Sequence, residues 1–375
     1  MTETFNARAL YTSAEHIEYP VIQVEDGRIL SVEAGAPNAS TEILTSAFFD
    51  IHVHGAVTHD FMAADPTQID EIGRFLAGKG VAYYLPTTVT GPIDKTLRAL
   101  SSLARKLALS TPHDAAAPVG INLEGPFLCP AKRGVHPLGY ILPPSIEQFN
   151  QFQEAAEGHI RLLTVAPEMP GALDLIAHAV QSGVRVSLGH SNATAAETLA
   201  AIEAGAISAT HTFNAMREIN HREPGIAGTV LDAEALFAEA IVDGVHLQPA
   251  IVRLWYKLKG EHKAILVTDG MSATGMPDGV YMLGELTVEV RDGVCLSDGV
   301  LAGSVLTLDR AVANLCRMTG APLATAVRLA SHNPATMLGR TDLLQITPGA
   351  PANFNLYNEA GDRLGSMLNG KRIPA

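Results

Sequence analysis

Eight short apolar runs, each ending in polar residues, alternate with helical patterns along the chain and predict an α/β fold. Eight strand–helix units close into a (β/α)8 TIM-type barrel of about 250 residues, which fits within the 375 residues of this chain. Both ends of the sequence carry short β-like pieces outside this alternation. The sequence therefore predicts a barrel with a small β-sandwich domain formed by the N- and C-terminal segments.

The predicted barrel strands are apolar runs of strand length that lie between amphipathic helical patterns. Ile69, Ile72 and Leu76 share one face of such a helix, as helical periodicity requires. Because right-handed crossovers join parallel strands, we expect the strands to follow one another around the barrel. In chain order the runs are Ala47–His54, Val81–Val89, Val119–Phe127, Ile160–Glu168, Arg185–Ser191, Ala206–Phe213, Glu239–His246 and Lys263–Gly270.

The terminal segments differ from the barrel pattern. We expect residues 1–45 and 345–375 to join into one discontinuous β-sandwich, because each is too short to bury a core alone, and residues 46–344 to form the barrel. The dipeptide Asp26-Gly27 is a hairpin turn signal between two of the short strands. Leu364–Ile373 reads as one further strand-like piece, and Tyr281–Leu301 predicts a hairpin inserted after the eighth barrel strand.

Composition excludes several classes of protein. The 26 basic and 39 acidic residues give a net charge of -13, which repels phosphate backbones and argues against nucleic-acid binding. No apolar stretch of about 18 residues and no N-terminal leader pattern supports a membrane or secreted location. Three scattered cysteines do not form a disulfide framework. We therefore expect a cytoplasmic protein whose partner is a small molecule.

Chemically active residues stand at the C-terminal ends of the predicted strands, which meet at one mouth of such a barrel. A single barrel histidine is more often a hydrogen-bonded core residue than a ligand, but several at one mouth favour a metal site. Imidazoles with a carboxylate suit zinc, with iron(II) or cobalt as alternatives. The residues are His52 and His54 on the first strand, Glu124 on the third, His190 on the fifth, His211 on the sixth and Asp269 on the eighth.

Six motifs in this order resemble the N-acetylglucosamine-6-phosphate deacetylase family of the amidohydrolase superfamily. The resemblance implies metal-dependent hydrolysis of the N-acetyl group of N-acetylglucosamine 6-phosphate to glucosamine 6-phosphate and acetate, in amino-sugar catabolism or recycling. It covers about residues 45 to 340, and the flanking segments are similar to the small second domain of that family. The motifs are Asp50–Gly55, Leu123–Phe127, Gly189–Thr194, Thr210–Met216, Arg222–Gly225 and Val267–Gly270.

The resemblance implies a role for each strand-end residue. Glu124, His190 and His211 correspond to the ligands of the principal metal ion, and the His52–His54 pair corresponds to the site of a second ion. One or two divalent ions per subunit are therefore expected. The predicted fourth strand contains no lysine, which supports a bridge by glutamate rather than by a carbamylated lysine. Asp269 corresponds to the aspartate that takes a proton from water and returns it to the departing amine.

The resemblance also implies a substrate site. His136 matches a substrate-contacting histidine, and Arg222 offers a bidentate fork for phosphate. His246 resembles a second phosphate contact, expected to come from a neighbouring subunit, and so implies a homodimer. The other residues expected to line the substrate are Val135, Asn214, Ala215, Asp243, Gly244, Val245, Leu301, Ala302 and Gly303.

Two alternatives remain open. The nearer one is another amidohydrolase, acting on N-acetylgalactosamine 6-phosphate or on another N-acyl compound, because Arg222 and His246 do not report the configuration at C4. The other is a non-catalytic sugar-phosphate-binding homologue, against which the intact Asp269 and the complete ligand set argue. The sequence departs from the resemblance after His54, where Ala56-Val57-Thr58 replaces a glycine-rich run and predicts a bulkier loop at the mouth.

Overall fold

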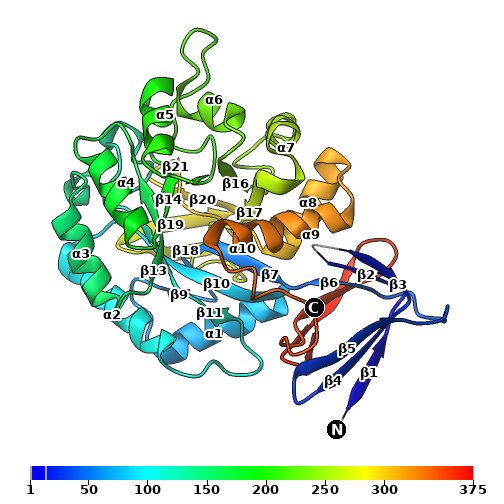
Figure 1. Ribbon diagram of the computed structural model, residues 1–375. Coiled ribbons are helices and arrows are strands. Elements are labelled where there is room, and N and C mark those ends of the chain that lie inside the picture. The colour runs from blue at the N-terminus through cyan, green and yellow to red at the C-terminus, as the bar shows by residue number, and fades with distance from the viewer. Residues whose placement is uncertain (1, 13–14, 375) are drawn as a thin grey trace.

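The computed structural model describes residues 2–12 and 15–374, and its centre is the predicted barrel (Figure 1). Each strand pairs in parallel with the next, and a bridge from Val53 to Gly270 brings the first strand to the eighth. All eight predicted strands are confirmed. They are β7 (Phe48–Val53), β10 (Val81–Thr88), β12 (Ile121–Glu124), β13 (Ile160–Val165), β14 (Arg185–Leu188), β15 (Ser208–Ala209), β16 (Phe237–Ile241) and β17 (Ala264–Val267).

Helices form a layer around the barrel (Figure 1). They bury one apolar face each; α1, for example, buries Ile69, Ile72 and Leu76 as predicted. Thr194 and Glu197 form a capping box that satisfies backbone N–H groups where α5 begins. The helices are α1 (Pro66–Gly78), α2 (Ile93–Leu107), α3 (Ile146–Ala155), α4 (Ala172–Gln181), α5 (Ala195–Glu203), α6 (Gly225–Asp232), α7 (Pro249–Lys263), α8 (Leu308–Thr319), α9 (Leu323–Ala330) and α10 (His332–Leu338). No helix of the described residues is long and apolar enough to cross a membrane.

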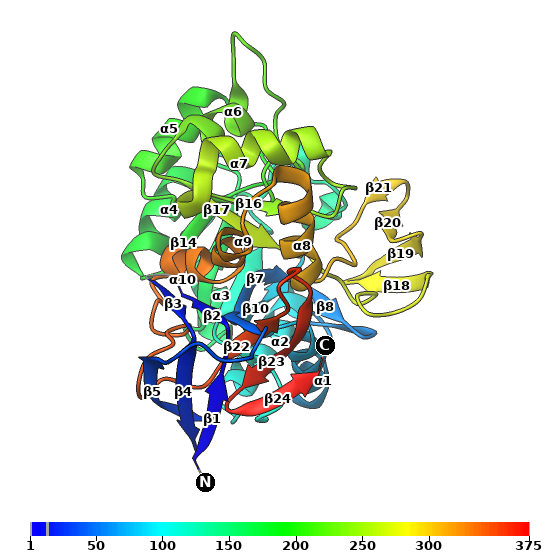
Figure 2. The ribbon, with the colours of Figure 1, turned by 90° about the vertical axis from the view of Figure 1, so that its right-hand side faces the viewer.

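The terminal segments build two sheets beside the barrel (Figures 1 and 2). Leu10, Ile22, Phe354 and Leu356 are buried in a core that these sheets share, so residues from both ends of the chain pack together. One sheet has the order β1 (Glu3–Asn6), β4 (Pro20–Glu25), β5 (Arg28–Ala34). The other has the order β24 (Lys371–Pro374), β23 (Arg363–Leu368), β22 (Phe354–Tyr357), β6 (Ile43–Ser46), β2 (Ala9–Tyr11), β3 (His16–Glu18).

Two turns define how these terminal strands pair. Asp26 and Gly27 both have positive φ, 49° and 78°, which matches the tight hairpin turn predicted from their sequence. The single strand predicted over Leu364–Ile373 is wrong, because that segment is the β23–β24 hairpin. Its turn residues Asn369 and Gly370 also have positive φ, so the chain reverses between the strands.

The insertion after the eighth strand is larger than the predicted hairpin. It is a four-stranded antiparallel sheet that projects to one side of the barrel in Figure 2. Val288 and Val290 alternate with exposed residues and pack into a small core with Met271 and Val89 near the barrel mouth. The strands are β18 (Gly279–Leu283), β19 (Leu286–Arg291), β20 (Val294–Ser297) and β21 (Val300–Leu301).

The loop after His54 forms a two-stranded hairpin, β8 (Gly55–Ala56) and β9 (His59–Asp60). Its turn residues Val57 and Thr58 have positive φ, 47° and 75°, which is strained for β-branched side chains. Their N–H groups donate to the carbonyls of Thr274 and Ser272, which hold the turn in place. The loop is therefore bulkier than a glycine run, as predicted, but neither turn residue lines the cavity described below.

Candidate active site and metal centre

A cavity of about 370 Å³ opens at the C-terminal ends of the barrel strands. It contains most of the site residues that the sequence predicts. His52 lies just beneath it and is fully buried. The lining residues include His54, Glu124, Val135, His136, His190, His211, Asn214, Ala215, His246, Asp269, Leu301 and Gly303.

Glu124 lies at the centre of the predicted ligands. Its Oε2 atom is 3.4 Å from His52 Nε2 and 3.2 Å from His54 Nε2. Its Oε1 atom is 3.3 Å from His190 Nε2 and 3.0 Å from His211 Nε2. One carboxylate therefore joins two groups of possible metal ligands, His52–His54–Glu124 and Glu124–His190–His211.

In three of these rings Nδ1 faces a hydrogen-bond acceptor, which favours the tautomer that carries its proton on Nδ1. The lone pair of Nε2 is then directed toward Glu124. His52 Nε2 is buried and has no hydrogen-bond partner among the described residues. Nε2 atoms of His190 and His211 are only 3.1 Å apart. Converging lone pairs and a carboxylate repel one another unless a cation lies between them. The Nδ1 contacts are His52 to Glu239 Oε2 at 3.3 Å, His54 to Thr87 O at 3.2 Å and His190 to Lys132 O at 3.1 Å.

This donor set fits a divalent metal ion, because imidazole nitrogen and carboxylate oxygen are ligands of zinc and similar ions. Burial lowers the pKa of His54, but Asp269 and Glu124 outweigh burial and raise it to about 9. Burial would raise the pKa of Glu124, yet the surrounding histidines hold it well below its usual range. A bound cation would displace the protons that these histidines otherwise take up.

Asp269 follows the eighth strand and lines the same cavity. Its Oδ1 atom lies 3.0 Å from His54 Nε2 and 3.5 Å from His52 Nε2. Burial alone would raise the pKa of Asp269, but the hydrogen bond to His54 and the charge of His52 bring it to about 2. The carboxylate is therefore ionised at neutral pH.

Three of the strand-end residues adopt an uncommon backbone conformation. His190, His211 and Asp269 have positive φ, 47°, 28° and 52°, although none is glycine. Such strain clusters at functional sites, where the surrounding structure holds it. Asp269 N donates to His52 O at 2.9 Å, and this bond links the eighth strand to the first where the barrel closes.

His136 lies beside His190, in the loop after the third strand. Its Nδ1 accepts from Thr90 N at 3.3 Å, so its Nε2 carries the proton and lies 3.8 Å from Glu124 Oε2. Burial, together with the charge of His190, lowers the pKa of His136 to about 3, so the ring is neutral. A neutral N–H donor at this position can contact a polar substrate group.

His246 lines the cavity of its own chain, so the expectation that a neighbouring subunit brings it there is corrected. Asp243 holds it: the carboxylate is 2.7 Å from His246 Nδ1 and accepts the N–H groups of Val245 and His246, both at 2.8 Å. Burial tends to lower the pKa of His246, but the bond to Asp243 outweighs burial and raises it. The imidazole therefore keeps its positive charge to higher pH.

The structure does not bring every predicted substrate residue to the cavity. Arg222 is exposed on the segment before α6, which projects at the top of Figures 1 and 2. Arg222, Asp243, Gly244, Val245 and Ala302 do not line the cavity. Asp243 acts through His246 and Ala302 is buried beside the lining, whereas Arg222 remains separate from the site of its own chain.

Glu239 is a functional candidate that the sequence reasoning did not single out. It is fully buried on β16, and its Oε2 atom faces His52 Nδ1 and accepts His211 N, both at 3.3 Å. It therefore contacts one histidine of each ligand group. A charged residue within the apolar run Phe237–Ile241 is the signal that could have identified it, because such residues are buried only when partnered.

The fold and the ligand geometry define a class of hydrolase, and comparison with known proteins agrees. Residues 43–373 match the amidohydrolase family model, so this chain belongs to the amidohydrolase family. The chain is 37% identical to an N-acetylgalactosamine-6-phosphate deacetylase of Escherichia coli O157:H7, over 94% of each chain. It is also 37% identical to an N-acetylglucosamine-6-phosphate deacetylase of Lysinibacillus sphaericus, over 85% of this chain and 82% of that one.

A solved structure is similar over the full length of both chains. It is an aspartate-to-alanine mutant of the N-acetyl-D-glucosamine-6-phosphate deacetylase of Mycobacterium smegmatis, in complex with N-acetyl-D-glucosamine 6-phosphate. The TM-score is 0.94 at 33% sequence identity. The similarity includes the barrel and the terminal sheets together.

Proposed function

We propose that this chain hydrolyses the N-acetyl group of N-acetylglucosamine 6-phosphate, giving glucosamine 6-phosphate and acetate in amino-sugar metabolism. The observation that carries the proposal is Glu124, shared by two pairs of buried histidines beside an ionised Asp269. Similarity to deacetylases of phosphorylated N-acetylhexosamines supports the substrate class. The few scattered, unpaired cysteines support a cytoplasmic location.

Glu124, His190 and His211 would hold the principal ion, and His52 and His54 would hold a second ion with the other oxygen of Glu124. Zinc fits these ligands best, with iron(II) or cobalt as alternatives. When bound, such an ion polarises a carbonyl and makes water a better nucleophile at neutral pH. The protein contributes fixed ring orientations and a site that is almost fully buried.

Asp269 would take the proton of the attacking water and return it to the amine as the carbon–nitrogen bond breaks. Amines leave poorly unless they are protonated, so a single carboxylate that moves one proton serves both steps. The position of Asp269 beside His54 supports this role, because the water has to lie near the same nitrogen ligands. His136 would donate its Nε2–H to a polar group of the sugar or of the acetyl carbonyl.

The phosphate end would be bound by basic residues at the other side of the cavity. His246, kept positive by Asp243, supplies one contact. Backbone groups of Asn214, Ala215 and Gly303 would line the sugar. Arg222 is exposed on its projecting segment and does not line this cavity, so we propose that a second copy of the chain in a homodimer supplies it.

The second candidate is deacetylation of N-acetylgalactosamine 6-phosphate. It is favoured by the relative of that name, which is as similar in sequence as the N-acetylglucosamine-6-phosphate deacetylase of L. sphaericus. The two substrates differ only in the configuration of one hydroxyl group. Comparison of kcat/KM for both sugars and for unphosphorylated N-acetylglucosamine distinguishes the candidates.

Replacement of Asp269 tests the mechanism. Asp269→Asn removes the proton acceptor but preserves the shape of the side chain, so kcat for acetate release should fall by at least about 100-fold. Metal content, measured by elemental analysis, should stay near the native value. His190→Ala is the contrasting variant and should lose most of the principal ion. Near-native turnover by Asp269→Asn would remove Asp269 from the mechanism, and no acetate from any N-acetyl sugar would favour a non-catalytic binding protein.

A further inference from the structure

The cavity that contains Asp269 and the candidate metal ligands also has an apolar side. Val89, Val135 and Leu283 line this cavity and pack in one small apolar core near the barrel mouth. We call these three side chains the apolar wall. Val89 and Leu283 are 3% and 2% exposed, so close packing fixes their positions. Neither metal binding nor proton transfer uses the apolar wall.

The turn between β18 and β19 holds the apolar wall in place. Gly284 in this turn has a positive φ of 58°, and a Cβ there would lie 2.6 Å from Val89 Cγ1, so the turn packs directly against Val89. Asp60 links the turn to the hairpin after the first barrel strand, because its Oδ2 atom accepts Gly284 N and its Oδ1 atom accepts Met62 N, both at 2.7 Å. The insertion after the eighth strand therefore closes this side of the cavity with side chains that have little room to move.

The apolar wall lies beside groups that would act on the amide of the substrate. Thr87, two residues before Val89, has its carbonyl oxygen 3.2 Å from His54 Nδ1. Thr90, directly after Val89, donates from its backbone N–H to His136 Nδ1 at 3.3 Å. Val89 therefore stands at the edge of the cavity that carries His54 and His136.

His246, the proposed phosphate contact, lies on the other side of the mouth. It follows β16, the seventh barrel strand, whereas Val135 belongs to the loop after β12, the third. The third and seventh strands of an eight-stranded barrel face each other across its axis. In N-acetylglucosamine 6-phosphate the phosphate on C6 and the amide on C2 project from opposite sides of the sugar ring. A substrate with its phosphate at His246 therefore directs its acyl group toward the apolar wall.

We propose that the apolar wall receives the methyl group of the acyl chain and restricts the substrate to N-acetyl groups. This inference rests on the proposed function and applies equally to the glucosamine and galactosamine substrates, because both carry the amide on C2 and the phosphate on C6. A longer acyl chain would have to displace packed side chains. In an apolar pocket one methylene changes kcat/KM by about 10- to 200-fold. An N-propionyl sugar should therefore bind at least about tenfold more weakly than the N-acetyl sugar.

The test measures binding separately from turnover. Metal-loaded Asp269→Asn protein is titrated calorimetrically with N-acetyl- and N-propionylglucosamine 6-phosphate, and the ratio of the two dissociation constants gives the acetyl preference. Leu283→Ala or Val135→Ala, added to Asp269→Asn, should lower this preference at least about fivefold, because each makes room for the additional methylene. Thermal unfolding checks that each variant folds. Val135 is only partly buried, so its truncation disturbs packing less than that of Leu283.

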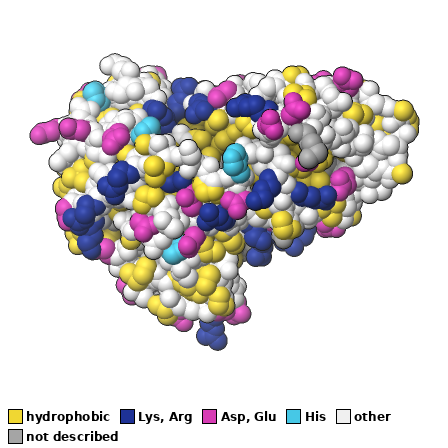
Figure 3. Space-filling model, turned by 90° about the horizontal axis from the view of Figure 1, so that it is seen from below, with side chains coloured by type: hydrophobic (Ala, Val, Ile, Leu, Met, Phe, Trp, Pro, Cys, Tyr) yellow, Lys and Arg dark blue, Asp and Glu magenta, His cyan; other side chains and the backbone are white. Residues whose placement is uncertain are grey.

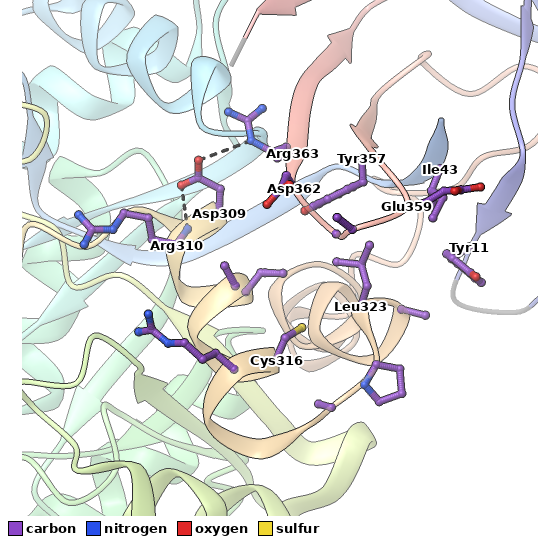
Figure 4. A pocket seen from close by; sticks show the side chains of 18 of the residues that line it. Tyr11, Ile43, Asp309, Arg310, Cys316, Leu323, Tyr357, Glu359, Asp362 and Arg363 are labelled. Carbon is purple, nitrogen blue, oxygen red and sulfur yellow. Dashed lines mark hydrogen bonds and ion pairs between the residues drawn. The ribbon is translucent and has the colours of Figure 1, made fainter. Parts of the chain in front are cut away.

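Two control variants remove apolar side chains elsewhere and should keep the acetyl preference. Val288→Ala changes the same small core at a residue that does not line the cavity. Leu323→Ala enlarges a separate cavity of about 900 Å³ between α8, α9 and the strands β22 and β23 (Figure 4), which shares no described lining residue with the candidate active site.

Three results would overturn the proposal: equal affinity of the Asp269→Asn protein for the two sugars, an unchanged preference in both wall variants, or the same shift in Val288→Ala. Absence of acetate release by the native protein would instead count against the proposed function, because the binding measurements need no turnover.

Discussion

Glu239 shows how much a single buried residue can contribute to the candidate metal centre. Its carboxylate accepts from His211 N and faces His52 Nδ1, and it is fully enclosed by the barrel. A carboxylate behind a histidine fixes the tautomer and makes the inner nitrogen a better ligand. We therefore regard Glu239 as a positioning residue for both ligand groups.

Glu239→Gln should weaken the affinity for at least one ion about 10- to 100-fold, because the amide removes the negative charge but preserves the shape. The measurement is metal content by elemental analysis after dialysis against increasing chelator. Glu289→Gln, exposed on β19, is the matched control and should bind metal like the native protein. Equal metal retention by both variants would show that Glu239 does not orient the ligands.

At the scale of elements, α7 holds the end of α6. Lys259 is 5% exposed and donates from Nζ to Val230 O at 2.9 Å and Ala233 O at 2.7 Å, where α6 ends. The last carbonyls of a helix lack partners within it, so this ammonium group satisfies acceptors that would otherwise be buried alone. Helix α6 follows the projecting segment that carries Arg222, so this contact holds the far end of the helix that the segment enters.

Lys259→Met should lower the free energy of unfolding by about 2–3 kcal/mol, because it leaves two buried carbonyls without donors. Burial lowers the pKa of Lys259 to about 8 from 10.5, so the unfolded chain binds this proton more tightly than the folded chain. The contribution of Lys259 to stability therefore rises with pH between about 8 and 10.5, and the deficit of the variant should grow over that range. Urea unfolding measures this difference in the free energy of unfolding, and Lys257→Met, at an exposed position, is the control. A deficit that does not change with pH would contradict the lowered pKa.

At the scale of the whole molecule, one chain presents the two residues of the proposed phosphate site in separate places. His246 lies in its own cavity and Arg222 lies outside it on an exposed segment. The face seen from below in Figure 3 carries basic, acidic and apolar side chains interspersed, so the net charge of -13 does not prevent local basic sites. A symmetric dimer that exchanges Arg222 would complete both cavities at once.

Complementation tests this arrangement. Arg222→Ala and His246→Ala should each raise KM for the phosphorylated substrate with little effect on the unphosphorylated sugar. When the two variants are co-expressed, about half of the randomly paired dimers contain one copy of each. Each of these mixed dimers has one complete site out of two. About a quarter of native activity at low substrate should therefore return. Arg222→Lys should restore less than half of the affinity, since a point charge replaces a bidentate fork. No gain on co-expression would place Arg222 outside the partner's site.

Much of the fold could be predicted from local patterns. The apolar runs and the polar residues that end them are local features, and the rules of parallel connection order them around a barrel. The errors lie where a turn divides a predicted element further, as at Asp298-Gly299 in the insertion and at Asn369-Gly370. Val57 and Thr58 with positive φ were also beyond prediction, because long-range bonds to Thr274 and Ser272 hold a conformation that their own propensities oppose.

The sequence by itself determined the candidate ligand set, because His52, His54, Glu124, His190 and His211 all end barrel strands and such ends must converge. Only the tertiary structure decided the partners of these residues. It brought Glu239 behind His52 and put His246 in the cavity of its own chain. The spacing of apolar residues in the sequence indicates which face of a helix or strand is buried. Contacts between distant segments depend instead on how the helices and strands pack against one another.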